Sequence, residues 1–311
     1  MKNIILHHYA DSPFSEKIRL LLGYKQQNYA VVSIPVIMPK PDLIPLTGGY
    51  RRTPVLQIGA DIYCDSALIA KVIDRLVPEN SIYPIESIAT AAATAQWTDT
   101  IFFWVCVSMA FQPKAMASNP LMQDAEASAA FMADRAQFMA SSGSLVMDPA
   151  SAHPYFLSHL KHLDHQLQSS PFLFGDAPTI ADFSTYHCCW FVHRIESLTI
   201  EFEPFKHVLN WFERMNGFGH GELIEMEGSE ALTIARHATP STFSKTTLTD
   251  IDHLAIGDDV VVNAIDYGCD PIYGKLQVSS IEELVVSLDD PQIGTLAVHF
   301  PRIGFQVRKQ A

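Results

Sequence analysis

The sequence has 311 residues, of which 48% are hydrophobic and 18% are charged, and its formal net charge is −13. This composition excludes an intrinsically disordered chain, and the negative charge disfavours a nucleic-acid partner. The longest apolar run, residues 101–111, is too short to span a membrane, and the N-terminus shows no signal-peptide pattern. We therefore expect a cytoplasmic protein with no membrane partner.

The first eighty residues alternate short apolar strands with helices, which predicts an α/β domain. The first strand ends in a loop that leads to Ser12-Pro13, where Ser is a favoured N-cap and Pro fits the first helical position. A helix start of this kind stabilises an anion. The predicted elements are strand 3–8, helix 13–24, strands 29–34, 54–58 and 61–64, and helix 66–76, with residues 59–61 as a hairpin connection.

Residues 85–238 carry helical patterns, after a linker that contains Pro78 and Pro84. The spacing of Thr179 and Asp182 is that of a capping box, with Asp in place of the usual Glu. An all-helical second domain is therefore expected. Its predicted helices are 87–111, 122–141, 153–168, 179–196, 205–216 and 228–237.

After Pro240 the sequence pattern changes from helical periodicity to short runs that are rich in β-forming residues. Turn residues at 266–268 and 289–291 separate these runs, and their spacing suits a small antiparallel barrel or meander. We expect residues 240–311 to form a β-rich extension. The runs are 260–262, 275–278, 284–288 and 295–300.

Neither a disulfide framework nor a metal site is expected. The five cysteines are odd in number, lie mainly in apolar stretches and show no CxxC spacing. His159, His162 and His165 recur every three residues, as on a solvated helix face, and no HExxH motif occurs. Cys64 lies in an apolar strand, where a buried thiol is expected.

Several motifs together resemble those of cytosolic glutathione transferases. The order and spacing of the motifs extend the resemblance over residues 1–238, while the extension lies outside it. It implies a thioredoxin-like domain at 1–80, a helical domain with an electrophile site at 85–238, glutathione as co-substrate, a detoxifying activity and a homodimer. The motifs are Ser12-Pro13-Phe14-Ser15 leading into Lys17-Ile18-Arg19, Arg51-Arg52-Thr53-Pro54-Val55-Leu56, Cys64-Asp65-Ser66-Ala67-Leu68-Ile69, and residues 173–182.

The resemblance also implies where glutathione binds. Thr53-Pro54 should be a cis bond that turns the backbone of Thr53 toward the cysteinyl part; the alternative is a trans proline that starts a strand. Asp65-Ser66 should hold the γ-glutamyl group, although the pair alone would suit an ordinary N-cap. Phe14 and Arg52 are further expected contacts. Arg51 or Lys40 is a candidate for the glycine carboxylate, with plain solvation the alternative for each.

Ser12 is the first candidate to stabilise the glutathione thiolate, because a hydroxyl at a helix start can donate to sulfur. Tyr9 at the strand end and Ser15 are the competing hydroxyls, and a purely N-capping Ser12 is the other alternative. A serine at position 12 cannot form the mixed disulfide of the family's cysteine-containing members. Conjugation, isomerisation or peroxidase chemistry therefore remains open.

The second substrate should be apolar, and Trp97 and Trp104 are the residues expected to line its site. Two other hypotheses concern the chain as a whole. The protein could be a non-catalytic binding protein that uses its acidic helical domain or its β extension to hold a partner. Alternatively, the extension covers the cleft and restricts substrate choice.

Overall fold

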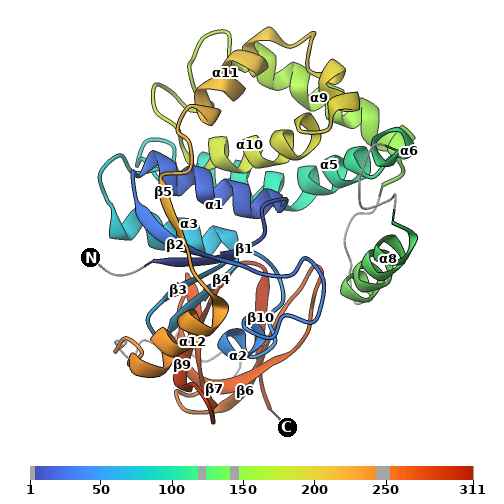
Figure 1. Cartoon of the computed structure of the whole chain (residues 1–311). Helices are drawn as coiled ribbons and strands as arrows, with labels where there is room; N and C mark the ends of the chain where they lie inside the picture. The colour runs from blue at the N-terminus through green and yellow to red at the C-terminus, as the bar shows by residue number, and fades with distance from the viewer. Residues whose placement is uncertain (1–3, 118–123, 141–146, 243–252, 311) are drawn as a thin grey trace.

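The computed structural model describes residues 4–117, 124–140, 147–242 and 253–310 (Figure 1). Within these ranges ten strands form one sheet, in the order β10-β6-β7-β8-β9-β4-β3-β1-β2-β5. The strands are β1 (Ile5–His8), β2 (Asn28–Ser33), β3 (Val55–Ile58), β4 (Asp61–Cys64), β5 (Glu222–Glu225), β6 (Asp259–Ala264), β7 (Ile272–Ser279), β8 (Glu283–Asp290), β9 (Gly294–Pro301) and β10 (Phe305–Lys309).

The helices lie on both faces of this sheet, and α1 and α3 separate it from the layer that contains α9, α10 and α11 (Figure 1). The helices are α1 (Pro13–Tyr24), α2 (Ile44–Thr47), α3 (Ser66–Leu76), α4 (Ile88–Trp97), the π-helix η1 (Thr98–Phe102), α5 (Phe103–Ala110), α6 (Pro113–Met116), α8 (Ala125–Met139), α9 (Pro149–Gln166), α10 (Ile180–His193), the 3-10 helix η2 (Glu196–Glu201), α11 (Lys206–Asn216) and α12 (Gly228–His237).

The first four strands and α1, α2 and α3 form the predicted thioredoxin-like unit. Strand β1 runs parallel to β2 and antiparallel to β3. Strands β3 and β4 form the predicted hairpin, in which Ile58 lies opposite Asp61. Side chains alternate between the faces of a strand, so Leu6 joins the core beneath α1 and α3, while Ile5 joins the core on the opposite face.

The extension confirms the predicted antiparallel meander and continues the same sheet. Strands β6 to β9 pair with their neighbours in chain order, β10 pairs with β6, and β9 lies parallel to β4. Side chains of the meander, such as Val298 and Phe300, share one core with Ile5, Val55 and Ile62. The extension therefore covers the sheet face that α1 and α3 leave open. The division of the chain at residues 80 and 240 stays a prediction.

The junction between β9 and β4 contains a buried histidine. His299 forms a hydrogen bond with Glu283 through Nδ1 at 2.6 Å and one with Asp61 through Nε2 at 3.3 Å, and the centre of its ring lies 4.3 Å from that of Tyr63. Ser241 N and Oγ also donate to Asp61. Polar contacts therefore reinforce the parallel pairing of strands that are far apart in the sequence.

The helical layer follows the predicted elements with three differences. A π-helix of five residues interrupts the predicted helix 87–111. Helix α9 begins before the predicted residue 153, because Asp148 accepts a hydrogen bond from Ser151 N and Pro149 fits the first turn. The predicted helix 122–141 is α8, although residues 122, 123 and 141 lie outside the described residues. The capping box of Thr179 and Asp182 is confirmed.

Two edge strands and three short helices were not predicted from the sequence. They are β5, which pairs with β2, β10, which pairs with β6, and the helices α2, α6 and η2. Among the helices that the structure describes, none is both long and apolar enough to cross a membrane.

Candidate functional site

The N-terminal end of α1 brings two hydroxyl groups together. Ser12 caps the helix: its backbone is extended, its Oγ accepts a hydrogen bond from Ser15 N at 3.2 Å, and Pro13 follows it. Ser12 N donates to the carbonyl of Tyr9 at 3.2 Å, which places Tyr9 beside the same helix start. Burial raises the pKa of the Tyr9 phenol, and the hydrogen bond with the Ser12 side chain acts in the opposite direction. The phenol is thus protonated at neutral pH and can donate.

The loop before β3 lies next to Tyr9. The Thr53–Pro54 bond is cis, as expected. Lys40 Nζ donates to Thr53 Oγ1 at 3.2 Å and to the carbonyl of Arg51 at 3.1 Å, and it lies 5.7 Å from the centre of the Tyr9 ring. Burial, together with the nearby charge of Arg135, lowers the pKa of Lys40 to about 8. Lys40 therefore connects this loop to the helix start.

The start of α3 places Asp65 and Ser66 on the same side of the sheet. Asp65 has a φ of 75° and a ψ of 131°, a backbone conformation that L residues rarely adopt, and its carboxylate accepts a hydrogen bond from Ala67 N at 2.9 Å. Burial raises the pKa of Asp65, and the charge of Arg52 opposes that effect. Ser66 is buried and accepts a hydrogen bond from Lys17 Nζ at 3.4 Å.

A cavity of about 190 Å³ joins these segments. Residues of the thioredoxin-like unit, of α4 and η1, and of the extension all line it. Ser12, Tyr9, Arg51 and Lys40 lie outside this lining. The lining residues are Phe14, Tyr50, Arg52, Thr53, Pro54, Asp65, Ser66, Ala67, Gln96, Asp99, Thr100, Ile265, Asp266, Tyr267, Ile303, Gly304 and Phe305.

Arg52 is the one guanidinium in that lining, and the extension holds it. Its NH2 group donates to the carboxylate of Asp266 and to the carbonyl of Tyr267, and its guanidinium lies 4.0 Å from the centre of the Tyr267 ring. Burial lowers its pKa, but Tyr267, Tyr50 and Asp266 together raise it above the usual value. Arg52 is therefore charged and already paired.

A buried polar network that reaches the cavity through Asp99 was missed from the sequence. Asp99 accepts hydrogen bonds from Lys17 Nζ at 2.6 Å and from Ser184 Oγ at 3.2 Å, and it lies 2.9 Å from His187 Nε2. Burial raises the pKa of Asp99, but Lys17 and His187 outweigh this and bring it down to about 2. One signal was available: Asp99 is the lone charged residue between positions 87 and 113.

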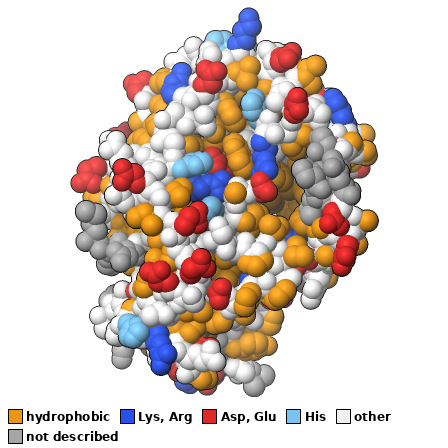
Figure 2. Space-filling view, viewed as in Figure 1, with side chains coloured by type: hydrophobic (Ala, Val, Ile, Leu, Met, Phe, Trp, Pro, Cys, Tyr) orange, Lys and Arg blue, Asp and Glu red, His pale blue; other side chains and the backbone are white. Residues whose placement is uncertain are grey.

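The two predicted tryptophans lie in different places. The ring of Trp104 contacts those of Tyr267 and Phe103, each at 5.3 Å, and so borders the extension. Trp97 stacks on Phe102 at 5.8 Å and contacts His159, inside the helical layer and outside the cavity lining. Figure 2 shows a hollow with hydrophobic walls on the face where Figure 1 has the N-terminal end of α1, α5 and α8.

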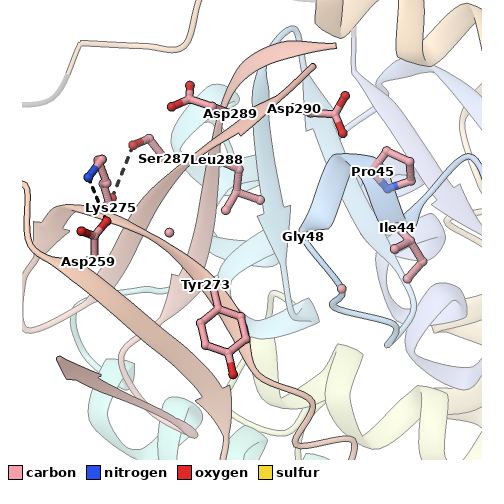
Figure 3. Close-up of a pocket in the computed structure, with 12 residues that line it drawn as sticks. Ile44, Pro45, Gly48, Asp259, Tyr273, Lys275, Ser287, Leu288, Asp289 and Asp290 are labelled. Atoms are coloured by element: carbon pink, nitrogen blue, oxygen red, sulfur yellow. Dashed lines mark hydrogen bonds and ion pairs between the residues drawn. The ribbon is translucent and has the colours of Figure 1, made fainter. Parts of the chain in front are cut away.

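A second, open hollow lies away from these residues, between α2 and the outer strands of the extension (Figure 3). Lys275, Asp259 and Ser287 lie close together on one side of it, and Tyr273 and Leu288 lie between them and Ile44. Among the described residues no group of three or more His, Cys, Asp or Glu side chains is arranged to hold a metal ion.

Comparisons with known families and structures agree with this architecture. Residues 6–81 match the glutathione S-transferase N-terminal domain and residues 124–214 match the C-terminal domain. A GST-like protein from Pseudomonas syringae is similar over 100% of both chains, with 38% identity and a TM-score of 0.81. No curated protein sequence matches the chain.

Two more distant structures share the fold over part of this chain. Glutathione transferase F2 from Populus trichocarpa has 15% identity and a TM-score of 0.52, with 75% of this chain and 98% of that chain covered. A glutathione S-transferase from Rhodospirillum rubrum F11 has 18% identity and a TM-score of 0.50, with coverage of 68% and 87%. The Pseudomonas protein, in contrast, also spans the extension.

Proposed function

The chain belongs to the glutathione S-transferase family, and within it we propose that this protein transfers the thiolate of glutathione to an apolar electrophile. One observation carries the proposal. The Tyr9 and Ser12 side chains meet at the N-terminal end of α1, beside the loop with the cis Thr53–Pro54 bond. This arrangement offers protonated hydroxyl groups and a positive helix end to a bound sulfur atom.

The chemistry needs an ionised thiol. A free cysteine thiol has a pKa of about 8.5 and is mostly protonated near neutral pH. A hydroxyl that donates to the sulfur and the positive end of a helix both favour the thiolate. The thiolate then forms a carbon–sulfur bond with the electrophile, and the leaving group departs with the electron pair. Ser12 is the first candidate donor and Tyr9 the second.

The segments around the cavity supply contacts for the rest of glutathione. The backbone amides at the start of α3 and the Ser66 hydroxyl suit the γ-glutamyl carboxylate, and the carboxylate of Asp65 suits the γ-glutamyl ammonium group. The backbone of Thr53 would pair with the cysteinyl part, with Phe14 and Arg52 as further walls of the site.

The electrophile would bind in the apolar hollow of Figure 2, near the N-terminal end of α1. Trp104 is the tryptophan that supports this placement, because its ring contacts Phe103 and, through Phe103, approaches Phe14. Trp97 stacks on Phe102 and lies outside the cavity lining, so it does not support this placement.

Conjugation of glutathione to chlorodinitrobenzene tests the proposal. We expect turnover by the wild-type protein and a loss of about tenfold or more in kcat/KM for Ser12→Ala, since one donated hydrogen bond to a charged group is worth about 1.5 kcal/mol or more. Tyr9→Phe and Ser15→Ala, assayed beside it, assign the donor: the variant with the largest loss identifies the hydroxyl. Unfolding curves are needed for each, because Ser12→Ala also removes the N-cap of α1.

The alternative is a non-catalytic glutathione-binding protein, which the small cavity and the paired Arg52 favour. This alternative would be supported if the protein is retained on immobilised glutathione but turns over none of a broad panel of electrophiles. We also propose a cytoplasmic homodimer with a role in detoxification, as in the family. Light scattering tests the dimer.

A further inference from the structure

The loop between β6 and β7 of the extension places a tyrosine in the wall of the glutathione cavity. Tyr267 lines the cavity and is partly buried. Its backbone carbonyl accepts a hydrogen bond from Arg52, and the next residue, Gly268, donates through its N–H to the carbonyl of Phe138 in α8 at 2.9 Å. The backbone at Tyr267 is therefore fixed to the loop before β3 and to the helical layer.

Three side chains hold the Tyr267 ring in place. The guanidinium of Arg52 lies 4.0 Å from its centre, and the rings of Trp104 and Phe138 meet it edge to face, each at 5.3 Å between ring centres. Trp104 belongs to α5 and Phe138 to α8, the helices beside the hydrophobic hollow of Figure 2. Tyr267 thus lies where the glutathione cavity approaches the hollow proposed for the electrophile.

The hydroxyl group of Tyr267 has no hydrogen-bond partner among the described residues. In contrast, three other hydroxyl groups of the cavity lining take part in hydrogen bonds within the chain, those of Thr53, Ser66 and Thr100. Burial raises the pKa of Tyr267, although the charge of Arg52 opposes this. The phenol is therefore protonated at neutral pH and has a hydrogen to donate to a ligand.

The position of Tyr267 suits the second reactant better than the sulfur atom. The candidate donors to the thiolate, Ser12 and Tyr9, lie at the start of α1 and outside the cavity lining. Tyr267 comes from the extension and packs on Trp104, the tryptophan that supports the electrophile site. Its hydroxyl would thus meet an acceptor atom on the electrophile.

We propose that Tyr267 is a catalytic residue that donates a hydrogen bond to an oxygen atom of the electrophile, and that the site favours α,β-unsaturated carbonyl compounds. This inference rests on the proposed function. The glutathione thiolate forms a bond to the β-carbon, and the electron pair of the carbon–carbon double bond moves so that the carbonyl oxygen becomes negatively charged. The α-carbon then takes a proton from water, and no group leaves.

The stabilisation by Tyr267 is largest where it accelerates the reaction. The hydrogen bond from the phenol strengthens as negative charge grows on the carbonyl oxygen, so it stabilises the transition state more than the bound substrate. Because Arg52, Trp104 and Phe138 already hold the ring, little reorganisation is needed when the charge appears.

Two electrophiles that each carry a phenyl ring test the inference. In benzylideneacetone the negative charge moves to a carbonyl oxygen, whereas in phenethyl iodide it leaves with iodide. We expect Tyr267→Phe to lower kcat/KM about tenfold or more for benzylideneacetone and less than about twofold for phenethyl iodide. The melting temperature should stay the same, because the variant keeps the ring and its hydroxyl has no partner to lose.

Tyr50→Phe is the matched control, since it removes a second phenol hydroxyl of the same lining. Tyr50 is 3% exposed, and its ring packs on Phe300 and Phe305 of the extension and not on the helical layer. This variant should leave the ratio of the two kcat/KM values as in the wild-type protein. Titration of the bound glutathione thiol should give the same pKa for Tyr267→Phe as for the wild-type protein.

The outcomes separate this inference from the proposed function. Equal losses for the two electrophiles in Tyr267→Phe, or no loss for either, overturn the inference alone. A higher thiol pKa in that variant would show that Tyr267 acts on the sulfur, and a large drop in its melting temperature would show a structural role; each also overturns the inference. If the wild-type protein turns over neither electrophile nor chlorodinitrobenzene, the proposed function is overturned as well.

Discussion

Replacement of Lys17 by Met should destabilise the protein by about 3 kcal/mol at pH 7. The Lys17 ammonium is fully buried and pairs with Asp99, whose pKa its partners hold at about 2 rather than 3.8. A difference of nearly two pKa units corresponds to about 2–3 kcal/mol, and deletion of one partner of a buried pair typically costs about 3–5 kcal/mol. Since the entropy of unfolding is about 2.1 cal/mol/K per residue, the midpoint temperature of thermal unfolding should fall by roughly 5 °C.

Urea unfolding curves and calorimetry of Lys17→Met, Asp99→Asn and the double variant measure this effect. The two losses should not add, because the double variant contains neither charge of the ion pair; the coupling should be about 1 kcal/mol or more. Asp99 has a lowered pKa, so its stabilisation is present above pH 3.8 and is lost as pH falls through about 2. A loss below about 1 kcal/mol, or strict additivity, would refute the reasoning.

Two further variants test the attachment of the extension. His299→Gln should lower the free energy of unfolding by about 3 kcal/mol at pH 6, because Asp61 and Glu283 outweigh burial and raise the pKa of His299. This loss should shrink as the pH rises above 6.5 through that raised pKa. Urea unfolding curves that give the same loss at pH 6 and pH 9 would contradict the reasoning. Gly268→Ala should destabilise by about 1–3 kcal/mol, because Gly268 has a φ of 53° and a Cβ would overlap the Phe138 ring; an unchanged melting temperature would show that the loop does not depend on this contact.

Local signals predicted much of the fold. Helix α1 begins and ends where predicted, because Ser12, Pro13 and the buried stripe with Ile18 are all encoded within a dozen residues. The capping box of Thr179 and Asp182 is local in the same way. Such elements follow from hydrogen bonds and periodicity between near neighbours, so they can be deduced without knowledge of the rest of the chain.

What was missed depends on contacts between distant segments. Strand β5 has four exposed residues and no alternation, so only its pairing with β2 makes it a strand. The pairing of β9 with β4, the ion pair of Arg52 with Asp266 and that of Lys17 with Asp99 join positions far apart in the sequence. No local pattern distinguishes a carboxylate with a buried partner from a solvated one.

The same reasoning applies to the site. The motifs around Ser12, Thr53 and Ser66 indicated which segments come together, and Phe14, Thr53 and Ser66 from these motifs line one cavity, although Ser12 lies outside its lining. The involvement of Asp266 and Tyr267 was not predicted, beyond the hypothesis that the extension covers the cleft. That hypothesis is supported by their place in the cavity lining.

The pKa of the thiol of bound glutathione tests the central claim most directly. The claim is that a hydroxyl at the N-terminal end of α1, from Ser12 or Tyr9, stabilises the thiolate. Titration of the thiolate's ultraviolet absorbance in the complex should give a pKa at least about one unit below the 8.5 of a free thiol, and Ser12→Ala or Tyr9→Phe should move it back up. A bound thiol that titrates like free glutathione in the wild-type protein would contradict the account.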